Sequence, residues 1–138
     1  MPRRISQKIG VKEEMRAFFL NAPQTALDAV NLPSLDVGSA LQGEFDYLHF
    51  FTKTQAEMDG MFPKLKNHLK STGMLRLSWP KGKKLGTDLA LPVVICIGYS
   101  HGLVESTCLS VDGTWSGLKF THPKKDKIYN NSHGQLKP

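Results

Sequence analysis

The sequence predicts an α/β fold in which a mostly parallel sheet carries helices on both faces and a C-terminal hairpin adds one antiparallel strand. Apolar runs typical of strands alternate along the chain with segments of helical periodicity, and this alternation is typical of parallel sheets. Turn residues at Asp112-Gly113-Thr114 separate the last two apolar runs, which indicates a closing hairpin. A chain of 138 residues is long enough for one domain with a single hydrophobic core.

The predicted strands are short apolar or alternating runs. Phe45–Phe51 (FDYLHFF) is almost continuously hydrophobic, which suits a parallel strand that is covered on both faces. The other predicted strands, in chain order, are Arg16–Asn21, the weak Leu35–Val37, Met74–Trp79, Leu103–Val111 and Trp115–Thr121. The last of these is expected to lie antiparallel beside Met74–Trp79.

Two of the predicted helices are marked by residues that begin or end a helix. Pro23 fits the first turn of a short helix over Gln24–Val30. A longer helix is expected to begin with Thr87 or Asp88 as its N-cap and to end just before Gly102.

A third helix is predicted between these two. Thr54 and Glu57 form a capping box, and apolar residues then recur at helical spacing as far as Leu69. Pro63 interrupts this pattern, because proline lacks a backbone donor and clashes with the preceding turn. It therefore predicts a kink or break near Gly60.

Basic side chains concentrate at the two ends of the chain. The formal net charge is +6; residues 1–16 carry five basic and two acidic side chains, and residues 119–138 carry five lysines and one aspartate. We therefore divide the chain into a basic N-terminal segment (1–15), one α/β domain (16–121) and a basic C-terminal tail (122–138). Basic tails can bind nucleic acid or anionic surfaces, but without arginine clusters or interleaved aromatic residues they are more often solvating tails.

The sequence contains no segment typical of membrane insertion or secretion. The apolar run Leu89–Ile97 is short and is interrupted by Pro92, so no membrane association is expected. The basic N-terminal residues are not followed by the apolar region of a signal peptide. Cys96 and Cys108 lie within apolar runs and lack CxxC spacing, so they predict buried thiols in a reducing compartment. Together these observations predict a cytoplasmic protein.

The order of four passages resembles the class I methyltransferases, which have a Rossmann-like fold. Phe45–His49 is similar to the fourth strand of that fold, Leu65–Leu75 to its LxxxLKPGGxL passage, and His101–Val104 to the passage before its sixth strand. The closing hairpin resembles its antiparallel seventh strand. The resemblance implies a methyltransferase-like fold, whose working members use S-adenosylmethionine (SAM) as cofactor.

A closer resemblance is to a family of small, uncharacterised bacterial proteins with a truncated methyltransferase-like fold. It rests on Lys8–Pro23 (KIGVKEEMRAFFLNAP), on Ser78–Lys84 (SWPKGKK) with Thr87-Asp88, and on Thr114–Phe120 (TWSGLKF) followed by a basic tail. It implies a bacterial protein with a reduced α/β domain, and no activity carries over from it.

The turn after the first strand departs from the cofactor-binding pattern. Nucleotide-binding α/β domains place a glycine-rich turn there, because glycine lets the backbone approach a phosphate or cofactor. Here the turn is Asn21-Ala22-Pro23, which contains no glycine. The resemblance also implies an acid after the second strand for the ribose hydroxyls, and Asp36 is the nearest candidate. We therefore predict a degenerate cofactor turn and no measurable SAM binding.

Functional groups of a parallel sheet gather at the carboxyl ends of its strands. Lys81, Lys83 and Lys84 are expected there, beside glycines and just before a helix N-terminus, which together favour an anion. A solvated loop is the alternative. Trp79 and Trp115 are expected at the same edge, where they could stack on a ring. The candidate anion pocket comprises Trp79, Lys81, Lys83, Lys84, Thr87, Asp88, Trp115, Ser116 and Lys119.

These observations favour a non-catalytic, methyltransferase-like domain that binds an anionic small molecule or a protein partner. One alternative is a SAM-dependent small-molecule methyltransferase with an atypical cofactor site. Another is nucleic-acid association through the basic termini. The five histidines lack HxH or HxxxH spacing, so no metal site is expected.

Overall fold

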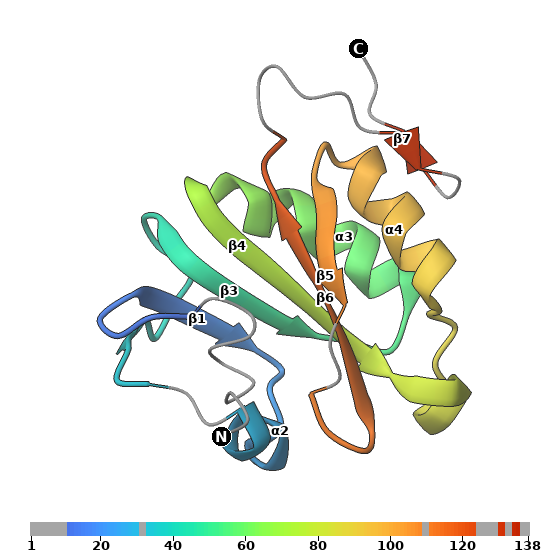
Figure 1. Ribbon diagram of the computed structural model, residues 1–138, viewed down its shortest axis with the longest axis horizontal. Coiled ribbons are helices and arrows are strands. Elements are labelled where there is room, and N and C mark those ends of the chain that lie inside the picture. The colour runs from blue at the N-terminus through green and yellow to red at the C-terminus, as the bar shows by residue number, and fades with distance from the viewer. Residues whose placement is uncertain (1–10, 31–32, 109–110, 124–129, 132–133, 136–138) are drawn as a thin grey trace.

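The computed structural model describes residues 11–30, 33–108, 111–123, 130–131 and 134–135, and its main feature is a six-stranded sheet (Figure 1). The strands of this sheet are β1 (Arg16–Leu20), β2 (Asp36–Val37), β3 (Phe45–Phe51), β4 (Leu69–Pro80), β5 (Val104–Cys108) and β6 (Trp115–Thr121). The helices are α2 (Gln24–Val30), α3 (Gln55–Asn67), the 3-10 helix η1 (Lys81–Gly86) and α4 (Leu91–Ser100). Two short strands, β7 (Asn130–Asn131) and β8 (Gly134–Gln135), pair with each other close to α4.

The predicted fold class is confirmed by the strand order, which is β2-β1-β3-β4-β6-β5. The first four of these strands run parallel to one another. β6 lies antiparallel between β4 and β5, with Trp79 opposite Ser116 and Leu77 opposite Leu118. The closing hairpin is therefore inserted beside β4, as its sequence predicts.

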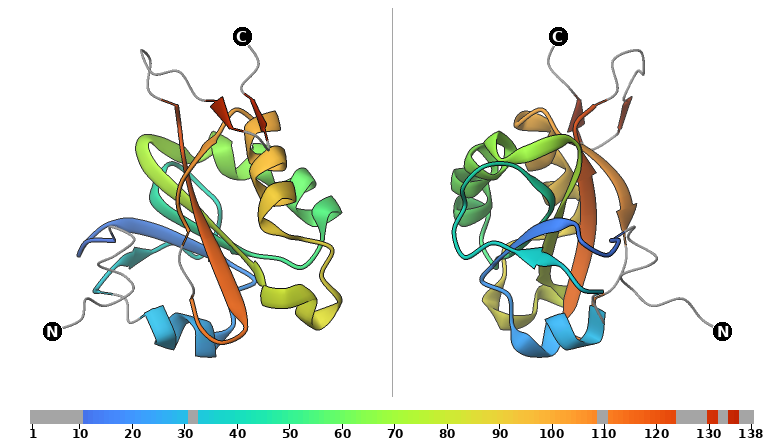
Figure 2. Two further views of the ribbon diagram at one scale, coloured as in Figure 1. Left: turned by 45° about the vertical axis from the view of Figure 1, so that its right-hand side comes forward. Right: turned by 90° about the vertical axis from the view of Figure 1, so that its left-hand side faces the viewer.

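One face of the sheet is covered by α3 and α4, which Figure 2 shows side by side on the same side of the strands. The main apolar cluster lies at this interface. Its fully buried members include Leu48 and Phe50 of β3, Leu75 of β4, and Phe62 of α3, whose ring packs edge-on against Phe120. Apolar burial of this kind is the dominant stabilising contribution to a fold.

The opposite face buries polar side chains in its centre. Tyr47 and His49 of β3 and Arg76 and Ser78 of β4 are each 1% exposed or less. Apolar residues around them form a second, smaller cluster that includes Ala26 of α2 and Val11. Ala26 is the α2 residue in this cluster, and α2 lies at the carboxyl-end edge of the sheet, whereas α3 and α4 both cover the other face (Figures 1 and 2).

Helix α3 begins as its capping box predicts. The Thr54 hydroxyl accepts a hydrogen bond from the Glu57 backbone N–H at 3.2 Å. Pro63 lies inside the helix, which continues unbroken to Asn67. Of the kink or break predicted near Gly60, the break does not occur, and Met58, Phe62 and Leu65, from both sides of Gly60 and Pro63, pack in the same apolar cluster.

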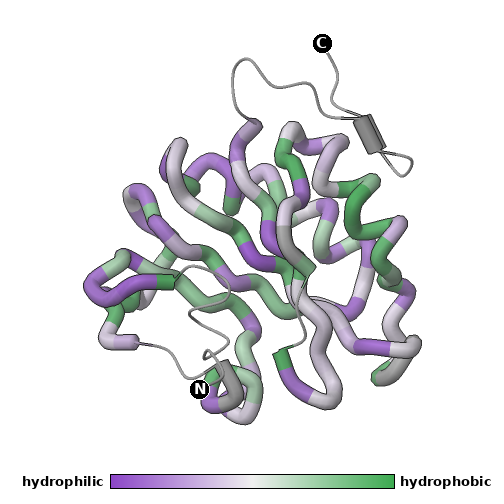
Figure 3. The backbone as a smooth tube through the Cα atoms, in the orientation of Figure 1, coloured by the Kyte–Doolittle hydropathy of each residue, from purple (hydrophilic) through white to green (hydrophobic). Residues whose placement is uncertain are grey.

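Helix α4 is more apolar than α3, and Figure 3 shows it as a largely green segment. Its end follows the prediction: Gly102 has φ +80 and donates to Tyr99 O, and Leu103 N–H donates to Gly98 O. These two bonds are the Schellman arrangement of a helix C-terminus. Its start does not follow the prediction, because the N-cap is Ala90 rather than Thr87 or Asp88.

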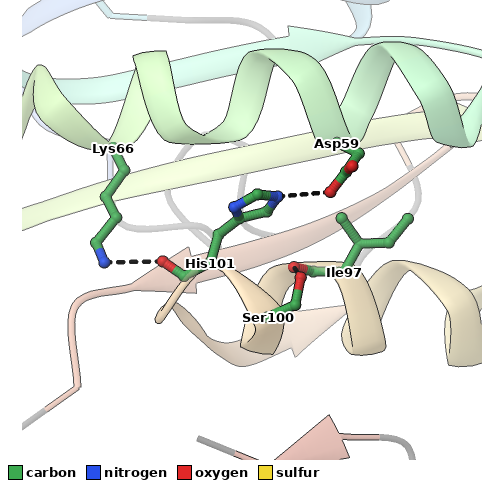
Figure 4. Close-up of polar contacts among 5 residues, drawn as sticks. All are labelled: Asp59, Lys66, Ile97, Ser100 and His101. Atoms are coloured by element: carbon green, nitrogen blue, oxygen red, sulfur yellow. Dashed lines mark hydrogen bonds and ion pairs between the residues drawn. The ribbon is translucent and has the colours of Figure 1, made fainter. Parts of the chain in front are cut away.

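Polar contacts join two positions of α3 to the C-terminal end of α4 (Figure 4). His101 Nε2 lies 2.7 Å from Asp59 Oδ1, and the Lys66 ammonium donates to the His101 carbonyl at 2.8 Å. Because Lys66 occupies the space beside Gly102, where a Cβ would lie 2.6 Å from its nitrogen, a side chain at that position would displace the lysine. The two helices are thereby fixed relative to each other at one end.

Two further predictions differ from the structure. Cys96 and Cys108 are both exposed, although their apolar neighbours predicted burial. Cys96 lies on the outer side of α4, and Cys108 is the last residue of β5. Val111, which was expected to end that strand, lies beyond it and donates from its backbone to Trp115 O.

Candidate functional site

A pocket of about 320 Å³ opens at the carboxyl ends of β1 and β3. β1 continues to β2 on one side, whereas β3 lies on its other side. This reversal of strand order is the position where open parallel sheets bind their ligands. We call it the switch-point pocket; it is lined by Asn21, Phe51, Thr52, Lys53, Glu57, Leu85 and Trp115.

Asn21 gives the first wall of this pocket an unusual backbone conformation. Its φ is +59, in the left-handed region that glycine adopts most easily. Asparagine is among the few other residues that tolerate this region, because its short polar side chain bonds locally. The turn after β1 therefore has the backbone conformation that a glycine would allow, although it contains no glycine.

Glu57 places a carboxylate in the switch-point pocket. Thr52 Oγ1 donates to Glu57 Oε1 at 2.6 Å, and Asn21 Nδ2 donates to the same oxygen at 3.4 Å. The Glu57 backbone is held by the cap bond to Thr54. Residues from the turn after β1, the segment after β3 and the first turn of α3 therefore meet at one carboxylate.

Lys53 brings a positive charge to the same pocket. Its backbone carbonyl accepts two hydrogen bonds, from the Thr87 hydroxyl at 2.7 Å and from the Asp88 N–H at 3.2 Å. Asp88 also accepts from the Gln55 N–H at 2.8 Å. Thr87 and Asp88, which the sequence placed in an anion pocket, thus support the segment that carries Lys53.

Aromatic rings connect the pocket to the buried polar residues of the sheet. Phe51 packs edge-on against Trp115, with ring centroids 5.2 Å apart, and stacks on His49 at 4.3 Å. His49 in turn lies 2.7 Å from the Tyr47 hydroxyl and 2.7 Å from the Ser78 hydroxyl. The inner wall of the pocket therefore packs on a buried, hydrogen-bonded group of the sheet.

Burial fixes the protonation of this group. It lowers the pKa of His49 well below its ordinary value, and the nearby Arg76 cation lowers it further. Burial also raises the pKa of the Tyr47 phenol, although Arg76 opposes that shift. Burial lowers the pKa of Arg76, whereas Tyr47 and Cys108 raise it. The imidazole is therefore neutral, with one ring nitrogen donating and the other accepting.

The predicted anion pocket is divided by the structure. Trp79, Lys81 and Ser116 line a second pocket of about 370 Å³, together with Gly82 and residues 89–91. Trp115 instead lines the switch-point pocket. Because consecutive residues of a strand point to opposite faces, Trp115 and Ser116 belong to pockets on opposite sides of β6.

The remaining predicted site residues lie elsewhere. Thr87 is buried behind Lys53, and Asp88 caps the Gln55 N–H, so neither lines the second pocket. Lys119 lies opposite Arg76, several residues along β6 from the Trp115 end. Lys83 and Lys84 belong to η1, and their side chains are outside the described part of the structure.

Asp36 lies at the amino end of β1, whereas a ribose contact would need it at the carboxyl end, where the pocket is. It pairs with Arg16, the first residue of β1, whereas the switch-point pocket is at the other end of that strand. The acid of this pocket is Glu57, which comes from α3. Neither Lys53 nor Glu57 was among the predicted site residues, and Glu57 already had a role in the capping box. The signal that could have found them is their position shortly after the Phe45–Phe51 strand, because the carboxyl end of that strand faces the site.

Within the described ranges, no group of three or more histidine, cysteine or acidic side chains could hold a metal ion. The same ranges contain no helix long and apolar enough to span a membrane.

No family model matches the chain, and comparison with curated proteins gives no match either. Solved structures do match. The chain is similar to a ribosomal protein L11 methylase from Lactobacillus delbrueckii subsp. bulgaricus, with 11% identity and a TM-score of 0.59 over 87% of this chain and 77% of the other. It is similar to a TehB-like SAM-dependent methyltransferase from Corynebacterium glutamicum, with 9% identity and a TM-score of 0.58 over 88% and 89%.

A third similar structure is the magnesium protoporphyrin IX methyltransferase from Synechocystis with bound SAH, with 12% identity and a TM-score of 0.54 over 86% and 82% of the two chains. The fold is that of a class I methyltransferase. At these identities the similarity establishes the fold and leaves the function to be argued from the site.

The prediction of no SAM binding is contradicted by these neighbours. They include a SAM-dependent enzyme and structures of one methyltransferase with bound SAH and with bound SAM, so the fold points towards SAM rather than away from it. The error lay in treating glycine as necessary for the turn after β1. Asn21 supplies the left-handed conformation there at a modest energetic cost.

Proposed function

We propose that this protein is a SAM-dependent methyltransferase for a small molecule, with an atypical cofactor site in the switch-point pocket. The observation that carries the proposal is the left-handed turn at Asn21, which forms one wall of a pocket at the strand-order reversal of a methyltransferase fold. We favour catalysis over a purely binding role because the pocket, the turn conformation and the fold all agree with the same cofactor.

The residues of the pocket fit SAM in size and in chemistry. A volume of about 320 Å³ is within the range of small-molecule sites, which hold roughly 300–1,000 Å³. The half-buried Trp115, which packs edge-on against the buried Phe51, offers ring surface for an adenine and can also attract a cation. Lys53, Glu57 and the Asn21 turn offer charged and polar contacts. When bound, SAM supplies a methyl group on a positively charged sulfur.

The chain's own part in the reaction is to bind and orient. Phe51 and Trp115 exclude water from the inner wall, and the neutral Tyr47–His49–Ser78 group beneath them keeps that wall in place. Methyl transfer to a nucleophile depends chiefly on holding the two reactants in line, so a site with few acid–base groups is sufficient.

Titration calorimetry with SAM and with SAH tests the proposal. We expect the wild-type protein to bind both. Asn21→Gly should retain binding because glycine adopts the same φ, whereas Asn21→Val should weaken it at least tenfold because a β-branched residue strains at φ +59.

Glu14→Val is the matched control. Glu14 also has a positive φ, of +66, but it lies before β1 and far from the pocket, so this variant should cost stability without changing affinity. Absence of SAM and SAH binding by the wild-type protein at millimolar concentration would refute the proposal.

A second candidate function is the binding of an anion in the pocket lined by Trp79, Lys81 and Ser116. One lysine and one hydroxyl in a largely apolar wall favour a ligand with a negative end and an apolar body. Tryptophan emission titrated with benzoate and with inorganic phosphate, in the wild type and in Lys81→Ala, tests it; an indifferent wild type refutes it.

A further inference from the structure

We propose that η1 is a lid on the switch-point pocket, hinged at Gly82 and Gly86, and that its Leu85 closes onto an apolar part of the bound ligand. The inference rests on the proposed function only in using SAH as one probe, because any ligand with an apolar ring or chain can be covered in this way. A second probe, which is unrelated to SAM, separates the two ideas.

The first observation is the backbone conformation of Leu85. Its φ is +56, in the left-handed region that a residue with a bulky side chain rarely adopts. Over the described ranges, the non-glycine residues with positive φ are Glu14, Asn21 and Leu85, and the last two of these line the switch-point pocket. Backbone strain of this kind collects at ligand sites and in switching segments. Leu85 is therefore a strained position that belongs to the pocket.

The second observation is the exposure of the Leu85 side chain, which is 58% exposed although it lines the pocket. Val37 of β2 is 57% exposed and lies outside the pocket, and such single apolar side chains are common on protein surfaces. Exposure alone therefore carries no argument. At the mouth of a pocket, however, the same apolar area can be buried against a ligand, which would stabilise the complex.

The third observation is the pair of glycines beside Leu85. Gly82 has φ +56 and Gly86 has φ +69. A Cβ at either position would meet no atom within 4 Å, so it is the backbone conformation, rather than packing, that favours glycine there. Glycine passes between the left-handed and right-handed regions at little cost. These two positions can therefore absorb the backbone rotations of a hinge.

The chain is fixed on the outer side of each glycine. The Lys81 N–H donates to the Thr114 carbonyl at 2.8 Å. Thr87 is buried, and its hydroxyl donates to the Lys53 carbonyl at 2.7 Å. A short segment with a permissive residue just inside each of two fixed ends can open and close without disturbing the rest of the fold, as catalytic lids do.

The position of η1 indicates which part of a ligand it would cover. η1 follows β4 directly, and Trp115, which also lines the pocket, pairs with Pro80 at the end of β4. Leu85 and Trp115 therefore give the pocket an apolar side beside β4 and β6. The polar residues Asn21 and Glu57 come from the β1 turn and α3. The ligand class that fits has an apolar ring or chain at one end and polar groups at the other.

Calorimetry and amide hydrogen exchange test the lid with two probes: SAH and 2-naphthol, an uncharged aromatic alcohol. At saturation, each should slow exchange of the backbone amides of residues 83–86 at least fivefold. Leu85→Ala should weaken the binding of both probes at least fivefold. It should leave the melting temperature of the free protein unchanged, because the side chain it removes is largely exposed.

Val37→Ala is the matched control, because it shortens an equally exposed apolar side chain outside the pocket; it should change neither affinity nor exchange. Binding of SAH with unchanged exchange at residues 83–86, or with unchanged affinity in Leu85→Ala, would overturn the lid and leave the proposed function intact. Binding and protection by 2-naphthol without binding of SAH would support the lid and refute the proposed function. Failure of both probes to bind would refute both.

Discussion

The two faces of the sheet differ in what they bury. The face under α3 and α4 is filled by leucine, phenylalanine and other apolar side chains, whereas the opposite face buries Tyr47, His49, Arg76 and Ser78 at its centre. Both faces bury large side chains, such as Phe62 on the first and Tyr47 on the second, so burial alone does not distinguish them. The difference is that the first face gains stability from apolar area, while the second depends on partners for every polar group it encloses.

This difference follows the position of the switch-point pocket. Phe51 and Trp115 pack on the face that buries the polar residues. The Phe51 ring contacts the buried His49 on one side and Trp115, which lines the pocket, on the other. The helix-covered face therefore sets the stability of the fold, and the polar face shapes the candidate site. Stability measurements on variants of each face test this division.

The largest effect is expected from Phe62→Ala on the helix-covered face. Phe62 is fully buried and packs edge-on against Phe120, so truncation should cost about 3–5 kcal/mol of unfolding free energy. Phe19→Ala on the polar face should cost clearly less, because Phe19 is only half-buried. Urea denaturation measures both, and equal costs would contradict the division between the faces.

The next effect concerns two helical glycines. A Cβ on Gly98 of α4 would lie 2.1 Å from a ring carbon of Phe120, so Gly98→Ala should destabilise by about 1–3 kcal/mol or more. Gly60 of α3 has open space around it, and Gly60→Ala should instead stabilise by about 0.5–1 kcal/mol. Thermal unfolding gives the two signs; a harmless Gly98→Ala would show that α4 is free to move away from the sheet.

The smallest effect is a pH dependence that belongs to the polar face. Because the folded pKa of His49 is lowered, the unfolded chain takes up the proton first as the pH falls below about 6.5. The unfolded state then binds more protons, so stability should fall with decreasing pH, by at most about 1.4 kcal/mol per pH unit from this group.

His49→Gln isolates that contribution, because glutamine can still hydrogen-bond but does not titrate. Its stability should decline less than that of the wild type between pH 7 and pH 5, measured by urea denaturation at each pH. Parallel declines would mean that His49 is not held neutral by its surroundings.

Local sequence signals predicted most of the fold. The capping box at Thr54 and Glu57, the stop at Gly102 and the hairpin turn before Trp115 each act through bonds between residues that are close in the chain. Where a local signal competed with packing, packing prevailed. Pro63 is retained inside α3, and α4 begins later than Thr87 because that hydroxyl bonds Lys53 instead.

Hydrophobic periodicity and turn chemistry are local, and they predicted the α/β class and the order of the elements. The place of the last strand beside β4 was predicted from this alternation together with the closing hairpin. The tertiary structure alone decided the site. It gave Asn21 its left-handed turn, brought Lys53 and Glu57 into one pocket and put Trp115 and Ser116 into different ones. Which side chains meet across strands depends on register and on the face each residue takes, and no short stretch of sequence contains that information.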